Sequence, residues 1–126
     1  MVYVSSLFLT RDTRPVSWIK AARKDFGKFP VGAREQIEDA LTLASEGRKA
    51  DIAKPMKGLG VGVFEIALRY RSDAYRAVYA LRVDEDIWVI HAFQKKAQQG
   101  IKTPQKEIDL IKQRVKRLRK DLERNE

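Results

Sequence analysis

The sequence contains no cysteine, and its 126 residues include a single histidine, His91. Disulfide bonds and thiolate metal sites are therefore excluded. With a single histidine, few side chains remain that could build a zinc site, a Cys-His pair or a Ser-His-Asp triad. We expect neither a metal nor a cofactor. The lack of cysteine is typical of proteins that work in a reducing compartment.

Long apolar runs are also missing, because none approaches the roughly 20 residues that a membrane-spanning helix needs. The apolar stretch near the start, residues 2–9, is too short, and it lacks the basic residues of a signal peptide. We therefore predict a cytoplasmic protein that makes no contact with a membrane.

Acidic residues are few in comparison with basic ones, 17 against 26, which gives a formal net charge of +9. This balance favours polyanionic partners, nucleic acid first and an anionic membrane surface second; a solvated basic surface is the plain alternative. The length is that of one domain with a modest core. We predict a single domain over residues 14–126 and a peripheral arm over residues 1–13.

Three consecutive strands are predicted in the middle of the chain. Apolar and charged side chains alternate over residues 64–71, and this period of two gives one apolar and one charged face. Short turns at residues 72–73 and 84–86 lead into two further runs, residues 75–81 and 87–93, and imply antiparallel neighbours. The last run is apolar at both parities, so we expect it in the sheet interior with both faces covered.

Helical spacing of apolar residues follows a short strand at Val16–Trp18. A first helix starts near Ala21, and a clear amphipathic helix covers residues 31–44, between Pro30, which suits a first helical turn, and Gly47, which suits a helix end. We expect these two helices to form a hairpin that covers one face of the sheet.

A final helix is predicted from Thr103-Pro104, a cap followed by a proline at the first helical position, to about residue 123. Its apolar residues make one seam at three-four spacing, and basic residues crowd its remaining surface. The seam is expected to pack on the sheet, whereas the basic face is either solvated or binds a polyanion. The seam consists of Ile108, Ile111, Val115, Leu118 and Leu122.

The segment over residues 47–62 is a basic loop that contains Gly58-x-Gly60-x-Gly62. A dinucleotide fingerprint would need a strand before these glycines and a helix after them, and neither is present in the pattern. The glycines are better explained as a sharp turn of the backbone into the next strand. Lys54 and Lys57 lie at the mouth of this loop, where they can reach a phosphate.

The side chains that could still take part in catalysis or bind phosphate are cations on the predicted strands. Arg69 and Arg71 share a parity and should point to the same face, Arg76 lies on the next strand and His91 on the third. Such a set suits cleavage of RNA through its own 2′-hydroxyl, which needs a base, cations for the phosphorus oxygens and a proton for the leaving oxygen, but no metal. A clustered lysine with a lowered pKa can join the proton transfers.

These considerations give two groups of candidate residues. For His91, a hydrogen-bonded histidine near the strand end is an equally weighted alternative. The catalytic candidates are Arg76, His91, Lys57 and Arg69, and the candidates for RNA or phosphate binding are Lys54, Arg71, Lys95, Lys96, Lys116, Arg117 and Lys120.

A resemblance to a known family rests on four segments: residues 54–60 (KPMKGLG), residues 63–66 (VFEI), residues 75–79 (YRAVY), and residues 89–96 (VIHAFQKK) with the Thr-Pro that follows. At this spacing the chain resembles the RelE/ParE toxin superfamily, specifically its HigB-like, phage-related branch, over about residues 14–118. The resemblance implies an α+β fold of the βααβββ type, with a mainly antiparallel twisted sheet, a helical hairpin and a C-terminal helix.

The resemblance also implies a function. Proteins of this kind enter the ribosomal A site and cut mRNA, and a cognate antitoxin neutralises them, in the HigB-like branch usually a HigA-like protein with a helix-turn-helix domain. Arg76 matches the arginine that stabilises the phosphate, and Lys95 and Lys96 match the basic pair after the last strand. Glu65 and Ala67 stand where RelE carries strand lysines, and Ile101 lies near the place of its C-terminal tyrosine, so the proton-transfer groups stay open between candidates such as His91 and Lys57.

The sequence thus predicts the toxin of a type II toxin-antitoxin system, a metal-independent and ribosome-dependent mRNA endonuclease whose partners are the antitoxin, the ribosome and mRNA. Two alternatives stay open, a ParE-like inhibitor of DNA gyrase and a basic RNA-binding module without enzymatic activity. The fold does not decide among them, because function lies in the site and not in the architecture.

Overall fold

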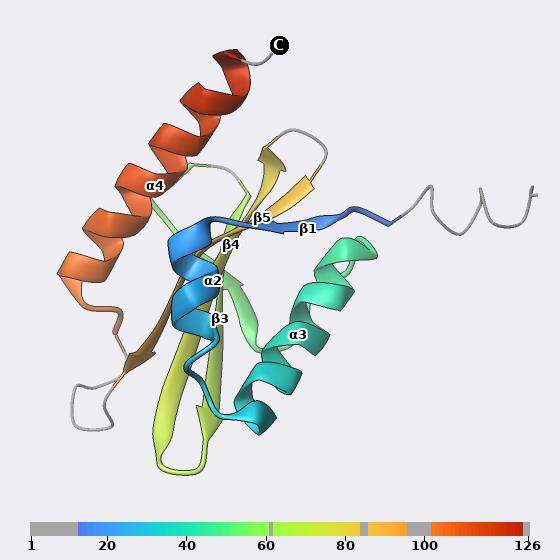
Figure 1. Cartoon of the computed structure of the whole chain (residues 1–126), viewed down its shortest axis with the longest axis vertical. Helices are drawn as coiled ribbons and strands as arrows, with labels where there is room; N and C mark the ends of the chain where they lie inside the picture. The colour runs from blue at the N-terminus through green and yellow to red at the C-terminus, as the bar shows by residue number, and fades with distance from the viewer. Residues whose placement is uncertain (1–12, 61, 84–85, 96–101, 125–126) are drawn as a thin grey trace, which may run out of the picture.

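The computed structural model describes residues 13–60, 62–83, 86–95 and 102–124, and the predicted α+β architecture is confirmed. Five strands form one sheet in the order β1-β5-β4-β3-β2, in which β1 runs parallel to β5 and the other neighbours are antiparallel (Figure 1). Of the predicted arm, only Thr13 belongs to the described residues. The elements in chain order are β1 (Val16–Trp18), α2 (Lys20–Phe26), α3 (Val31–Ser45), β2 (Ala53–Pro55), β3 (Val63–Tyr70), β4 (Asp73–Val83), β5 (Asp86–Lys95) and α4 (Gln105–Arg124).

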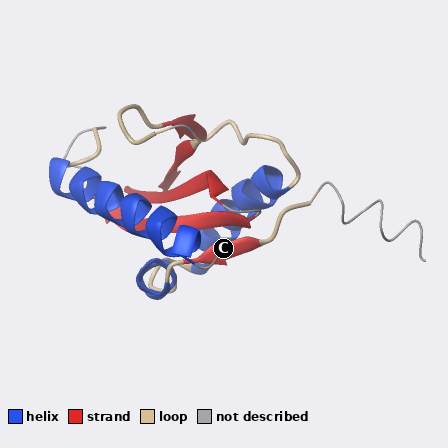
Figure 2. Cartoon of the chain, turned by 90° about the horizontal axis from the view of Figure 1, so that it is seen from above, coloured by secondary structure: helices blue, strands red, loops and turns tan. Residues whose placement is uncertain are grey.

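The predicted three-stranded meander is confirmed as β3, β4 and β5, with β5 in the interior of the sheet between β1 and β4. Ile87 and Val89 of β5 pack with the core that includes α2 and α3, whereas Ile90 packs with α4. The lack of alternation in this run therefore reflects a strand covered on both faces, as expected. Figure 2 shows the sheet from above, where its strands are twisted relative to one another.

The strand β2 was not predicted, because the sequence reads as loop over residues 47–62. Its three residues pair antiparallel with β3, Ala53 opposite Ile66 and Pro55 opposite Phe64. A run of three residues is too short to show a period of two, and proline lowers the strand signal. Proline is tolerated here because β2 is the edge of the sheet, where a missing N–H costs no internal ladder bond.

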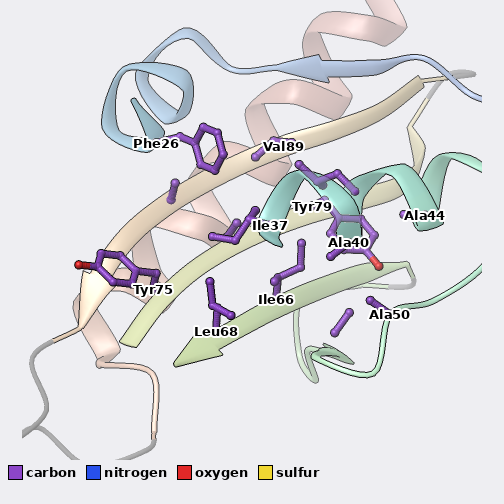
Figure 3. Packing of buried hydrophobic residues seen from close by; sticks show 14 of the residues in the cluster. Phe26, Ile37, Ala40, Ala44, Ala50, Ile66, Leu68, Tyr75, Tyr79 and Val89 are labelled. Carbon is purple, nitrogen blue, oxygen red and sulfur yellow. The ribbon is translucent and has the colours of Figure 1, made fainter. Parts of the chain in front are cut away.

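Two apolar layers lie on the two faces of the sheet. On one face, α2 and α3 contribute side chains such as Phe26 and Ile37, which meet Ile66 of β3 and Tyr79 of β4 (Figure 3). On the other face, α4 covers the sheet from behind in the same view. The expected packing of the helical pair against one face is thereby confirmed. Within the described residues, no helix is both long enough and apolar enough to span a bilayer.

The end of α3 shows why Gly47 stops this helix. Gly47 has a φ of 82°, a left-handed conformation that favours glycine. Its N–H donates to the carbonyl of Ala44 at 3.0 Å, and the N–H of Arg48 donates to the carbonyl of Leu43 at 2.8 Å. These two bonds satisfy the last carbonyls of the helix in the manner of a Schellman motif.

The predicted seam of α4 is confirmed. Ile111, Val115 and Leu118 are buried against a patch that includes Val78 and Ile90. The helix starts at Gln105, so Pro104 immediately precedes the first helical residue rather than occupying it. The carbonyl of Pro104 still accepts the first helical hydrogen bond, from the N–H of Ile108 at 3.1 Å.

An irregularity in β5 determines which side chains face α4. Val78 of β4 pairs with His91, but the next residue, Tyr79, pairs with Val89, so Ile90 is an extra residue in the ladder. A β-bulge of this kind allows two consecutive side chains to face the same side. Ile90 packs on Ile111 and its neighbours, and His91 bonds to two side chains of α4.

Candidate functional site

A buried polar cluster lies on the face of the sheet that α4 covers, where the helix begins. We define it as Glu65 of β3, Arg76 of β4, Lys95 at the end of β5, and Thr103. The register pairs Ala67 with Arg76 and Glu65 with Val78, so Glu65 and Arg76 are diagonal neighbours on one face.

Glu65 and Arg76 form an ion pair in which nitrogen NH1 of Arg76 lies 3.0 Å from Oε1 of Glu65. The hydroxyl of Thr103 donates to Oε2 of Glu65 at 2.7 Å and accepts from NH1 of Arg76 at 3.3 Å. Arg76 is only 7% exposed. The carboxylate and the guanidinium are thus held in a fixed orientation beneath the residues that lead into α4.

Lys95 adds a second buried cation, with an exposed fraction of 1%. Its Nζ donates to the carbonyl oxygen of Lys102. Burial lowers the pKa of Lys95, the Arg76 guanidinium lowers it further, and Glu65 opposes the change. A lysine whose pKa is lowered can take up and release a proton closer to neutral pH than an exposed lysine can.

The lowered pKa of Lys95 predicts that the stability of the protein depends on pH. Between the lowered pKa of Lys95 and the ordinary value of 10.5, the unfolded chain binds a proton that the folded chain does not. The free energy of unfolding should therefore rise with pH through this window. Tyr79 acts in the opposite direction above pH 10, because burial raises its pKa to about 12 and the folded chain then holds the extra proton.

Urea unfolding at a series of pH values measures both effects. Lys95→Met should flatten the rise below pH 10 and leave the fall above pH 10 in place. Lys54→Met, which removes an exposed lysine of β2, is the matched control and should keep the wild-type profile. Parallel profiles for wild type and Lys95→Met would contradict the assignment.

His91 lies beside this cluster in a second group of polar side chains. Its Nε2 is 3.0 Å from Oε1 of Glu107, and its Nδ1 is 3.1 Å from NH1 of Arg114. Because a guanidinium only donates, Nδ1 accepts and Nε2 carries the proton that is donated to Glu107. Arg114 also donates to the carbonyl of Ile90 at 3.0 Å.

His91 is 4% exposed, and its ring stacks on Phe93 with centroids 5.1 Å apart. Both ring nitrogens are engaged with residues of α4. The geometry is that of a hydrogen-bonded histidine near the strand end, which ties β5 to α4. In this conformation His91 does not present a free nitrogen to a substrate.

The other strand candidates lie at different distances from the polar cluster. Lys54 pairs with Glu65 across β2 and β3, so both face the same side, and Lys54 is exposed. Arg69 is also exposed and shares the parity of Glu65 on β3. The structure therefore places Lys54 and Arg69 at the open border of the face that holds Arg76 and Lys95.

Arg71 does not share a face with Arg69, so this expectation was wrong. Arg71 follows the last residue of β3 and has a φ of 58°, which breaks the alternation of a strand. Its guanidinium lies over the ring of Tyr70, 5.3 Å from the centroid, and Tyr70 packs with the core on the side of α3. The turn has redirected the side chain away from the polar cluster.

The remaining candidates lie elsewhere or outside the described residues. Lys57 is exposed in the loop between β2 and β3. The exposed residues Lys116, Arg117 and Lys120 lie in the second half of α4, away from its start. Lys96 is outside the described residues.

Four residues of these polar groups were not among the candidates: Glu65, Thr103, Glu107 and Arg114. Glu65 lies on the charged face predicted for residues 64–71 and Arg76 lies on the next predicted strand, so their opposite charges could have indicated a pair. No comparable signal exists for Glu107 and Arg114, since helical spacing shows only that they lie off the apolar seam. In the described part of the chain, no group of three or more acidic or histidine side chains is arranged to hold a metal ion.

Comparison with known protein families identifies a match over residues 24–116 to the family described as Phage derived protein Gp49-like (DUF891). The chain belongs to this family. The matched region runs from α2 into α4 and includes all of the polar cluster. A comparison with curated proteins finds no significant match.

A solved structure confirms the RelE-like fold that the resemblance implies. A mutant of the E. coli toxin RelE in the free state aligns with a TM-score of 0.58 and 22% identity, over 83% of this chain and 97% of that chain. The RelBE2 toxin-antitoxin complex from Mycobacterium tuberculosis aligns with a TM-score of 0.46 and 19% identity, over 66% of this chain and 92% of that chain. At 22% identity, the likeness to RelE shows the fold alone.

Proposed function

We propose that this protein is the toxin of a type II toxin-antitoxin system and that it cuts mRNA on the ribosome. The observation that carries the proposal is the polar cluster, in which one carboxylate and two buried cations meet on one face of a RelE-like sheet. Lys54 and Arg69 add exposed positive charge at the border of that face, where an RNA strand would approach.

The cluster contains the groups that cleavage through the 2′-hydroxyl requires. The Glu65 carboxylate accepts the proton of the 2′-hydroxyl, whose oxygen attacks the phosphorus to form a 2′,3′-cyclic phosphate while the bond to the 5′-oxygen breaks. Arg76 stabilises the charge that builds on the phosphorus oxygens, and Lys95 supplies the proton for the departing 5′-oxygen. The proton that Glu65 gains equals the one that Lys95 loses, so the step balances without a metal.

Entry of RNA requires an exchange of hydrogen bonds. In this conformation the hydroxyl of Thr103 donates to Glu65 and accepts from Arg76, and it thereby occupies the place of a substrate. A 2′-hydroxyl replaces its bond to Glu65, and a phosphate oxygen replaces its bond to Arg76. The departing 5′-oxygen likewise replaces the Lys102 carbonyl as the acceptor for Nζ of Lys95. We assign His91 to the attachment of α4 and Lys57 to phosphate contact at the loop between β2 and β3.

An antitoxin fits the charge of the chain. A net charge of +9 with exposed cations beside the cluster favours a partner that supplies carboxylates, because opposite charges speed encounter, while apolar contacts hold the complex. We propose a HigA-like partner with a helix-turn-helix domain, encoded next to this protein. The complex should bind its own promoter through the recognition helix of the antitoxin.

Primer extension on cellular mRNA after induced expression tests the proposal. We expect new 5′ ends inside reading frames, and the neighbouring gene, when co-expressed, should suppress them and restore growth. Damaged DNA with intact mRNA would instead favour a ParE-like inhibitor of gyrase. Normal growth and intact mRNA without any partner would favour an RNA-binding module that has no enzymatic activity.

A further inference from the structure

Residues 112–123 of α4 line one wall of a basic groove that lies apart from the polar cluster. The opposite wall is the loop between β2 and β3 at Gly58 and Leu59, and the hollow between them has a volume of about 430 Å³. Lys112, Lys116 and Lys120 line it from the helix. We call this hollow the α4 groove.

At Gly60 the backbone of the loop comes close to a side chain of the helix. Gly58 and Gly60 have φ values of 80° and 93°, which favour glycine. A Cβ on Gly60 would lie 3.2 Å from NH1 of Arg119, so a larger residue there would press on a side chain that lines the groove. Leu59 is buried in the apolar cluster beneath and fixes the loop to the sheet.

The charges of the groove are strongly unbalanced. Four cations line it, and Glu123 is the acidic residue among its lining. Within the described part of the chain, Lys112, Lys116 and Lys120 make no ion pair. A second hollow of about 390 Å³ shares Lys116 and Lys120, and there Arg117 lies 3.8 Å from Asp121.

We propose that the α4 groove binds the phosphate backbone of RNA outside the place of cleavage. Lys112, Lys116 and Lys120 recur every four residues, so along the helix axis they repeat at about 6 Å, comparable to the separation of successive phosphates in an extended strand. The groove starts roughly 10 Å along α4 from Gln105, by the helical rise, so a strand held there need not touch the polar cluster. This inference rests on the proposed function in taking RNA as the polyanion.

The composition of the groove favours RNA over an acidic protein segment. Its apolar residues, Leu59 and Val115, are buried at 7% and 5% exposure and offer little surface to a protein side chain. A protein partner would gain little apolar burial there, whereas a nucleic acid strand gains affinity from cations alone through the release of its counterions.

Two matched pairs of substitutions test the inference. Lys116→Gln/Lys120→Gln removes two exposed helical lysines of the groove, and Lys20→Gln/Lys24→Gln removes two exposed lysines at the same spacing on α2. Fluorescence anisotropy measures binding of the purified full-length chain to a labelled single-stranded 12-nucleotide RNA at several salt concentrations. The groove pair should weaken binding by about tenfold at low salt and reduce the slope of log K against log salt by about 0.7 for each lost phosphate contact.

The control pair should leave the affinity within about twofold of wild type. An equal loss of RNA affinity in both pairs would mean that only the net charge matters. No loss in the groove pair would mean that these lysines are solvated and do not bind RNA. Either result overturns the inference. A 12-residue acidic peptide is the third arm. Peptide binding that depends on the groove pair, together with unchanged RNA binding, would assign the groove to an acidic protein.

This test is independent of the proposed nuclease activity, because equilibrium binding needs neither a ribosome nor cleavage. If the wild type binds RNA through the groove but cuts no mRNA, the proposed function fails and the groove assignment stands. If the groove pair binds RNA normally while the wild type cuts mRNA, only the groove assignment fails. If the groove assignment and the proposed nuclease activity both hold, the groove pair should raise KM for ribosome-bound mRNA and leave kcat unchanged.

Discussion

Replacement of Arg76 by alanine is expected to lower the rate of mRNA cleavage by about 10²–10³-fold, by analogy with the removal of one oxyanion donor. Arg76 is the cation closest to the Glu65 carboxylate, and its guanidinium is held in place by Glu65 and Thr103. The loss should appear in single-turnover cleavage of mRNA on purified ribosomes. Arg69→Ala, which removes an exposed arginine from the same face, should cost much less.

A structural effect of the same substitution must be separated from the catalytic one. The side chains of Arg76 and Glu65 are 9% and 15% exposed, and removal of one partner from a buried ion pair costs about 3–5 kcal/mol. The double variant Glu65→Gln/Arg76→Met removes both charges of the ion pair, leaves Lys95 as the remaining cation of the cluster, and should recover part of this stability in urea unfolding. If it also recovers cleavage, Arg76 has a structural role and the catalytic assignment fails.

Ile111→Ala is expected to lower the free energy of unfolding by about 2–5 kcal/mol. Ile111 is fully buried between α4 and the sheet, so truncation removes apolar contacts and leaves a cavity. Ile108→Ala is the matched control, because Ile108 lies three residues earlier on the same seam but is only partly buried. It should cost clearly less.

Urea unfolding of both variants measures this difference through the midpoint, with the slope unchanged if the transition stays two-state. Equal losses for Ile108→Ala and Ile111→Ala would mean that the packing of α4 is uniform along the helix. A negligible loss for Ile111→Ala would show that α4 contributes little to the stability of the domain.

Periodicity in the sequence was sufficient to predict an element where the apolar side chains of that element all lie on one face. The alternation predicted over residues 64–71 corresponds to β3, which ends one residue earlier at Tyr70, and the three-four seam became the buried face of α4. Both signals are local, since they depend only on the repeat of a strand or a helix. The short edge strand β2 was missed because three residues do not establish a period.

The polar contacts could not be predicted in the same way, because their partners are distant in sequence. Thr103 bonds to Glu65, 38 residues earlier, and Arg114 bonds to His91, 23 residues earlier. The strand pattern placed Arg76 on the strand next to residues 64–71 but could not show that a carboxylate would lie against it. Arg71 failed for a local reason, since a single left-handed residue reverses the parity that the expectation assumed.

The parallel pairing of β1 with β5 has a consequence for how the chain folds. Val16 lies opposite Ile87, and the hydroxyl of Ser17 donates to Asp86, 69 residues further along, at 2.6 Å. Such contacts close a long loop, whose entropy must be lost before the pairing is gained, and they are typical of slow folding. A chain still under synthesis cannot complete this edge until β5 has emerged, and Thr103 reaches Glu65 later still. Under the proposed function, we therefore expect that the growing chain cannot cut the mRNA on its own ribosome until the last third of the chain has been released.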